Sequence, residues 1–178
     1  MTINRNIVIK ASSALLVAAL LYIGITLIAP LAKGEKIYRD KISGTSFRYP
    51  SYFGDPKTEK SFTIFDSEKY RISFRSGSFS EYSTPIEQVK SEVGKEDHAS
   101  IIDLPNGLKS YVSFKISKEK TGKMIAIIPG NRNDAVEISV ASKEQLIKPT
   151  DEGTFSEISD ITDIKELTTK IISSLEMK

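Results

Sequence analysis

A stretch of 22 residues without a charged side chain, beginning at Ala11 and ending at Ala32, constrains the fold of this chain most strongly. At a rise of 1.5 Å per residue, a helix of this length spans about 33 Å, enough to cross the hydrocarbon core of a bilayer. The apolar region of a cleavable signal peptide is shorter, roughly 7–15 residues. We therefore expect residues 11–32 to form a retained transmembrane anchor that holds the protein in a membrane, with a cleaved signal as the alternative.

The charges on either side of this segment bear on its orientation. Residues 1–10 form a basic tail in which Arg5 and Lys10 carry the charge, and four basic residues follow the anchor closely: Lys33, Lys36, Arg39 and Lys41. Counted literally, the positive-inside rule places the following domain in the cytoplasm. A short basic tail followed by an apolar segment and a whole domain is, however, the usual layout of an exported protein. We expect a single-pass membrane protein whose C-terminal domain is extracytoplasmic.

Charge and composition exclude several partners and sites. Beyond the anchor the chain carries 23 basic and 23 acidic residues, so the domain is formally neutral. Nucleic-acid binding depends on a basic surface that neutralises phosphates, and we therefore expect no nucleic-acid partner. The chain has no cysteine, which excludes disulfide bonds, thiolate metal ligands and a cysteine nucleophile.

The rest of the chain divides into a stalk and one domain. Residues 33–43 are polar and charged without an apolar period, which predicts a stalk between membrane and domain. Residues 44–178 have the length of one domain. Within them, apolar side chains alternate with polar neighbours as in half-buried strands: Phe47, Tyr49, Phe62, Ile64, Tyr70, Ile72, Phe74, Val112, Phe114, Ile116, Val136, Ile138 and Val140. A Pro-Asn-Gly turn at residues 105–107 predicts a hairpin.

One helix is predicted in the middle of the domain. Thr84 and Glu87 have the spacing of a capping box, with Pro85 at the first helical position. Gly94 supplies a stop signal. The sequence therefore predicts a short capped helix over residues 85–93.

A second helix is predicted to close the domain. Apolar residues recur at helical spacing between residues 161 and 175, and the helix should begin near Ser159 or Asp160. Glu166 and Lys170 have the spacing of a favourable i,i+4 pair. Together these elements predict an α+β fold, with an antiparallel β-sheet covered by helices.

Three short phrases stand along these elements: Ser-Gly-Thr-Ser-Phe-Arg-Tyr-Pro at residues 43–50, Leu-Pro-Asn-Gly at 104–107 and Ile-Ile-Ser-Ser-Leu at 171–175. In this order they resemble the Mog1/PsbP-like fold over residues 42–178. The resemblance implies a small bacterial exported or membrane-anchored domain with an accessory or binding role. The tryptophan that usually follows the Tyr-Pro phrase is missing, and Tyr52 and Phe53 stand in its place. No active-site residues of the family match, so none are carried over.

No local motif indicates catalysis. His98, the single histidine, has no second ligand at helical spacing and does not make a zinc site alone. Asp160, Asp163 and Glu166 fall in the first turns of the predicted final helix, where carboxylates favour the positive end of the helix dipole. We therefore expect no catalytic, cofactor or metal site, and no enzyme activity.

Two places are the best candidates for an interaction surface. One is the aromatic cluster Tyr49, Tyr52 and Phe53, for which packing in the core is the competing interpretation. The other is the polar loop over residues 129–134, with Asn131 and Arg132. We expect a membrane-anchored, non-catalytic interaction or accessory module that binds a protein partner. The alternative is a membrane-anchored, hydrolase-like enzyme in which His98 moves protons.

Overall fold

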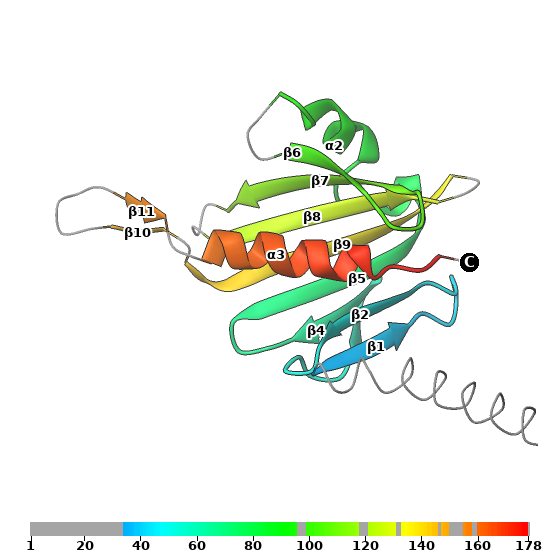
Figure 1. Cartoon of the computed structure of the whole chain (residues 1–178), viewed down its shortest axis with the longest axis horizontal. Coiled ribbons are helices and arrows are strands. Elements are labelled where there is room, and N and C mark those ends of the chain that lie inside the picture. Colours follow the sequence, from blue (N-terminus) through cyan, green and yellow to red (C-terminus); the bar gives the residue numbers. More distant parts are fainter. Residues whose placement is uncertain are drawn as a thin grey trace, which may run out of the picture.

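The computed structural model describes residues 34–95, 99–117, 121–130, 133–145, 147–149, 155–157 and 160–177 (Figure 1). The predicted tail and anchor lie outside this part of the chain. Among the helices of the described residues, none has the length and apolar character needed to cross a membrane.

A seven-stranded antiparallel sheet organises the domain. Its strand order is β3-β4-β5-β9-β8-β7-β6. The strands are β3 Lys57–Glu59, β4 Phe62–Asp66, β5 Tyr70–Ser78, β6 Ala99–Asp103, β7 Lys109–Ile116, β8 Thr121–Pro129 and β9 Asp134–Gln145. The hairpin of β6 and β7 confirms the turn signal at residues 105–107. A separate two-stranded sheet pairs β10 Ile147–Pro149 with β11 Phe155–Glu157.

One face of the sheet carries the main core. Phe74, Ile138, Ala126 and Val112 stand opposite one another on the four central strands, and all four are buried. As predicted, the inward side chains of β9 alternate with outward ones, because successive residues of a strand point to opposite faces. The facing predicted for Val136, Ile138 and Val140 is thereby confirmed.

Two elements cover this face (Figure 1): the helix α3 Asp160–Ser173 and the antiparallel hairpin of β1 Glu35–Arg39 and β2 Ser46–Pro50. The helix contacts β8, β9 and β2. Tyr38 of β1 packs against the rings of Phe47, Phe65 and Phe74 at centroid distances of 5.1–5.4 Å. Beyond α3, Glu176 pairs with Ser46 through two backbone hydrogen bonds of 2.9 Å.

Within the described residues, the 3₁₀ turn η1 Phe79–Glu81 and the helix α2 Ile86–Glu92 lie on the opposite face. Ile86 and Val89 of α2 bury a second, smaller apolar cluster with Ile125 and Ile127 of β8. Beside it, Arg75 of β5 lies opposite Glu137 of β9.

This arrangement corrects the predicted fold class. The chain was expected to be α+β with a helix-covered sheet, whereas the described residues are mainly antiparallel β-structure with two α-helices. The physical reason is that a β-hairpin, and not a helix, shares the main core face with α3. That hairpin includes Glu35–Arg39, which the sequence predicted as stalk. The sequence signal for a strand is weak there, because charged side chains dominate the segment and Tyr38 is its single inward aromatic residue.

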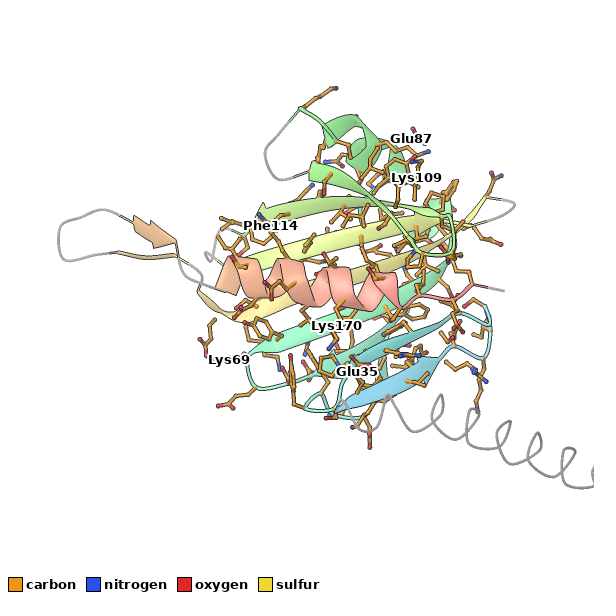
Figure 2. The ribbon with its side chains drawn as sticks, viewed as in Figure 1. Glu35, Lys69, Glu87, Lys109, Phe114 and Lys170 are labelled. Atoms are coloured by element: carbon orange, nitrogen blue, oxygen red, sulfur yellow. The ribbon has the colours of Figure 1, made fainter. Side chains whose placement is uncertain are left out.

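Both helices lie where they were predicted, but their local contacts differ. Thr84 and Glu87 form no capping box: Pro85 is the N-cap residue of α2, and it has no side-chain capping bond. In α3, Lys170 makes its ion pair with Glu35 of β1, at 2.8 Å, and not with the predicted partner Glu166 (Figure 2). A tertiary contact therefore takes the place of the expected local one.

Candidate functional site

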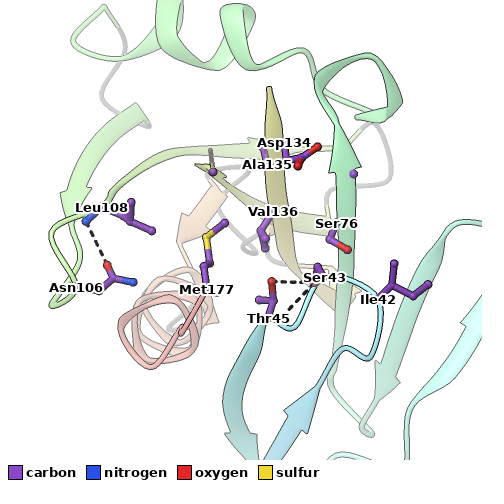
Figure 3. A pocket seen from close by; sticks show the side chains of 12 residues that line it. Ile42, Ser43, Thr45, Ser76, Asn106, Leu108, Asp134, Ala135, Val136 and Met177 are labelled. Carbon is purple, nitrogen blue, oxygen red and sulfur yellow. Dashed lines mark hydrogen bonds between the residues drawn. The ribbon is translucent and has the colours of Figure 1, made fainter. Parts of the chain in front are cut away.

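A pocket of about 710 Å³ opens at the end of the sheet where β5 ends and β9 begins (Figure 3). Its wall comes from five regions far apart in the sequence, namely the β1–β2 turn, the end of β5, the β6–β7 turn, the loop after β8 with the start of β9, and the segment after α3. The lining residues are Ile42, Ser43, Thr45, Ser76, Gly77, Asn106, Leu108, Gly130, Asp134, Ala135, Val136 and Met177. The pocket is thus assembled by the fold and has no single sequence motif.

The β1–β2 turn is held rigidly by Asp40. Its Oδ2 atom accepts hydrogen bonds from Ser43 N at 2.8 Å, Ser43 Oγ at 2.5 Å and Ser76 Oγ at 3.2 Å. Gly44 completes the turn with a φ of 70°, a conformation that favours glycine. Since Ser76 belongs to β5, these bonds fasten the turn to the sheet as well as to itself.

The charge of Asp40 is stabilised by the same contacts. Partial burial raises the pKa of its carboxyl group, but the hydrogen bonds from Ser43, the backbone of Ile42 and Ser76 outweigh burial and lower the pKa below its ordinary value. Asp40 is therefore ionised at neutral pH and its lone pairs are engaged in the turn.

Ile42 projects from this turn at the rim of the pocket (Figure 3). With 95% of its surface exposed, it is the most exposed of the large apolar side chains in the described part of the chain. The Asp40 bonds hold the backbone on both sides of it, so the side chain is presented from an ordered turn. Such a residue costs little to bury against a partner, because its position is already fixed.

The opposite wall is also ordered. Asn106 accepts a hydrogen bond from Leu108 N at 3.2 Å and donates one to the backbone oxygen of Leu175 at 3.3 Å. The β6–β7 turn is thereby joined to the segment after α3, from which Met177 reaches the pocket. A flexible methionine beside polar walls can adapt to different apolar groups.

The hydroxyl groups of Ser43 and Ser76 in this pocket both donate to Asp40. Ser43 Oγ donates to Asp40, but a carboxylate with a lowered pKa is a weak base and activates a hydroxyl group poorly. Ser43 Oγ also contacts Thr45 Oγ1 at 2.9 Å within the turn. Across the described residues, no group of three or more acidic, histidine or cysteine side chains could hold a metal ion.

Two of the three aromatic residues pack in the core, which is the competing interpretation of this cluster. Tyr49 and Phe53 are buried in the main core, where Tyr49 packs on Phe65 at a centroid distance of 4.7 Å. Alternation along β2 turns Tyr49 toward the sheet. Only Tyr52, with 61% of its surface exposed, is accessible, and it lies far from the pocket along the β1–β2 hairpin.

The other predicted site residues lie outside the described part of the chain: Asn131, Arg132 and His98. Gly130 and Asp134, on either side of that loop, line the pocket, and a role for Asn131 and Arg132 stays a prediction. Ile42 was missed. It stood in a segment interpreted as stalk, where an apolar residue among charged and polar neighbours was the only signal.

Comparison with known proteins informs the fold alone. No protein-family model matches the sequence, and no curated protein matches it. A crystal structure of a protein from Bacteroides thetaiotaomicron VPI-5482 is similar, with a TM-score of 0.50 and 18% identity, over 80% of this chain and 48% of that one. The chain thus spans about half the length of that protein. The resemblance to the Mog1/PsbP-like fold stays a prediction.

Proposed function

We propose that this protein is a membrane-anchored, non-catalytic interaction module that binds a protein partner through the pocket beside Ile42. The domain is extracytoplasmic and is tethered by residues 11–32. The observation that carries the proposal is the fully exposed Ile42 on an ordered turn at the rim of the pocket. An apolar side chain held in an ordered turn can be buried against a partner with little loss of conformational entropy.

The polar lining suits a partner segment that combines an apolar group with backbone or side-chain hydrogen bonds. Ser76 and Asp134 lie on one side of the pocket, and Leu108 and Met177 offer apolar contacts on the other (Figure 3). The polar groups would set the orientation of the bound segment, and the apolar side chains would bury its apolar group.

Crosslinking in intact cells followed by affinity purification of the full chain tests the proposal. Fully burying an isoleucine contributes about 1.5–3 kcal/mol. Ile42→Ser should therefore reduce partner recovery roughly tenfold or more, since 1.4 kcal/mol is a factor of ten in affinity. Ile101→Ser is the matched control, because Ile101 is 47% exposed on β6 and does not line the pocket. Equal recovery of the partner by both variants would refute the assignment.

A separate experiment tests on which side of the membrane the domain lies. Protease added to intact spheroplasts should digest the domain and leave a cytoplasmic marker whole. Survival of the domain until the membrane is permeabilised would show that the literal charge count around the anchor decides the topology.

The alternative, a membrane-anchored hydrolase-like enzyme, needs a proton acceptor beside a nucleophile. The lowered pKa of Asp40 makes it a poor acceptor for the proton of Ser43, so this function depends on His98. Hydrolase activity that is lost in His98→Ala would favour the enzyme over the interaction module.

A further inference from the structure

The tether between anchor and domain is much shorter than the sequence suggests. The apolar segment ends at Ala32 and β1 begins at Glu35, so only Lys33 and Gly34 lie between them. Three steps of fully extended chain span at most about 11 Å. The start of β1 must therefore lie within about 11 Å of the point where the anchor leaves the bilayer.

Gly34 is fixed to the body of the domain. Its backbone oxygen accepts a hydrogen bond from Ser51 N at 2.7 Å. The adjacent Glu35 is buried and pairs with Lys170 of α3 (Figure 2). Any restraint that the anchor applies at Gly34 is therefore passed to the hairpin and to α3 together.

The surface around Gly34 contains an exposed aromatic residue. Tyr52 lies beside Gly34 in a shallow cavity of about 440 Å³. Its ring stacks on the buried ring of Phe53 with centroids 4.9 Å apart, so the ring is presented from a rigid support. Tyrosine is enriched at membrane–water interfaces, because its ring is apolar and its hydroxyl group remains hydrated.

The pocket lies at the other end of the same hairpin. Glu35 pairs with Pro50 at the Gly34 end and Arg39 pairs with Ser46 at the turn that carries Ile42. At about 3.4 Å per residue, the five residues of β1 separate the two ends by roughly 15 Å.

We infer that the edge formed by Gly34, Ser51 and Tyr52 lies against the lipid headgroups of the membrane that holds the anchor, and that the pocket beside Ile42 faces away from it. This inference rests on the proposed anchoring of residues 11–32. The short tether, and not a general lipid affinity, sets the orientation. The binding pocket is therefore presented to partners away from the bilayer surface.

Single-cysteine variants test the orientation without background labelling, because the natural chain has no cysteine. Ser51→Cys and Lys41→Cys replace exposed residues at opposite ends of the hairpin. Each full-length variant is labelled with an environment-sensitive fluorophore in phosphatidylcholine–phosphatidylglycerol vesicles that contain a headgroup-nitroxide lipid. Fluorescence from position 51 should be quenched several-fold more than fluorescence from position 41.

A variant with a lengthened tether separates the effect of the tether from other causes. Insertion of a 20-residue Gly/Ser linker between Lys33 and Gly34 gives the domain a root-mean-square reach of about 25 Å. Quenching at position 51 should then fall to the level at position 41.

The outcomes are distinguishable. Equal or reversed quenching in protein that co-floats with vesicles would overturn the orientation and leave the anchor intact. Quenching at position 51 that is unaffected by the linker would overturn the role of the tether. Failure of the full chain to co-float would overturn the proposed anchor and this inference with it.

Discussion

Arg75 and Glu137 form an ion pair between neighbouring central strands, with Nη2 of the arginine 3.0 Å from Oε2 of the glutamate, and both side chains are buried. The guanidinium group lies between the rings of Phe62 and Tyr82, at 4.7 and 4.8 Å from their centroids. Ser83 Oγ donates to the other carboxylate oxygen of Glu137 at 2.8 Å. Charge, cation–π contacts and a hydrogen bond together stabilise two ions away from solvent.

Removing one partner of this pair should lower the free energy of unfolding much more than removing both. We predict that Glu137→Leu lowers the free energy of unfolding by about 3–5 kcal/mol, because it leaves the Arg75 charge buried without its counterion. The double variant Arg75→Met/Glu137→Leu should lose clearly less of the free energy of unfolding. Urea unfolding of Glu137→Leu, Arg75→Met and the double variant checks this. If the double variant loses as much free energy of unfolding as the two single variants together, the pair does not act as a unit.

A charge in the main core should unfold the domain. Ile138 is 0% exposed in the middle of β9. We predict that Ile138→Asp abolishes cooperative thermal unfolding, since an unpaired buried carboxylate costs several kcal/mol against a total stability of about 5–15. Ile116→Asp, at an exposed site on β7, is the control and should alter stability by about 0.5 kcal/mol or less. A wild-type melting temperature for Ile138→Asp would contradict the facing of β9.

Two truncations should behave very differently. A fragment that begins at Gly34 keeps β1 and should be folded and soluble. A fragment that begins at Gly44 removes the whole predicted stalk, and with it Tyr38 and its three ring contacts. Tyr38 is half-buried against the main core, and truncation of a fully buried aromatic side chain costs about 3–5 kcal/mol. Loss of Tyr38 together with the rest of β1 should therefore make the shorter fragment melt at a much lower temperature or aggregate. Similar melting curves would restore the stalk interpretation.

The contacts of Asp40 in the β1–β2 turn predict that the stability of the domain depends on pH. Because the folded-state pKa of Asp40 is lowered, its contribution to stability is present above the unfolded-state value of about 4 and is lost as the pH falls through the folded-state value. Asp40→Asn should therefore be less stable than the natural chain at pH 7, and the difference should shrink below about pH 4. Thermal unfolding between pH 7 and pH 3 measures it. A difference that stays constant over this range would show that the charge of Asp40 does not stabilise the turn.

The elements with strong local patterns could be predicted from the sequence. The alternation along β9 places Val136, Ile138 and Val140 in the core, and the helical spacing in α3 does the same for Ile164 and Ile171. Burial of one face therefore produces the sequence pattern of both elements. The class of the fold could not be predicted in this way, because it depends on which element shares the core face with α3.

The missed features depend on contacts between distant segments. Glu35–Arg39 becomes a strand by pairing with β2 and by the packing of Tyr38. Lys170 reaches Glu35, which local helix rules do not consider. The pocket joins residues near positions 42, 76, 106, 134 and 177, so no window of the sequence contains it.

The pairing of Ser46 with Glu176 sets an order on biogenesis. Segments 130 residues apart must meet, so β2 obtains this partner only after α3 and the residues beyond it have been synthesised. Contacts between such distant residues slow folding. The hairpin of β1 and β2 is therefore synthesised early, and its pairing is completed late. Transport of an unfolded chain across a membrane imposes the same order, because Ser46 can pair with Glu176 only after the C-terminal segment has also crossed.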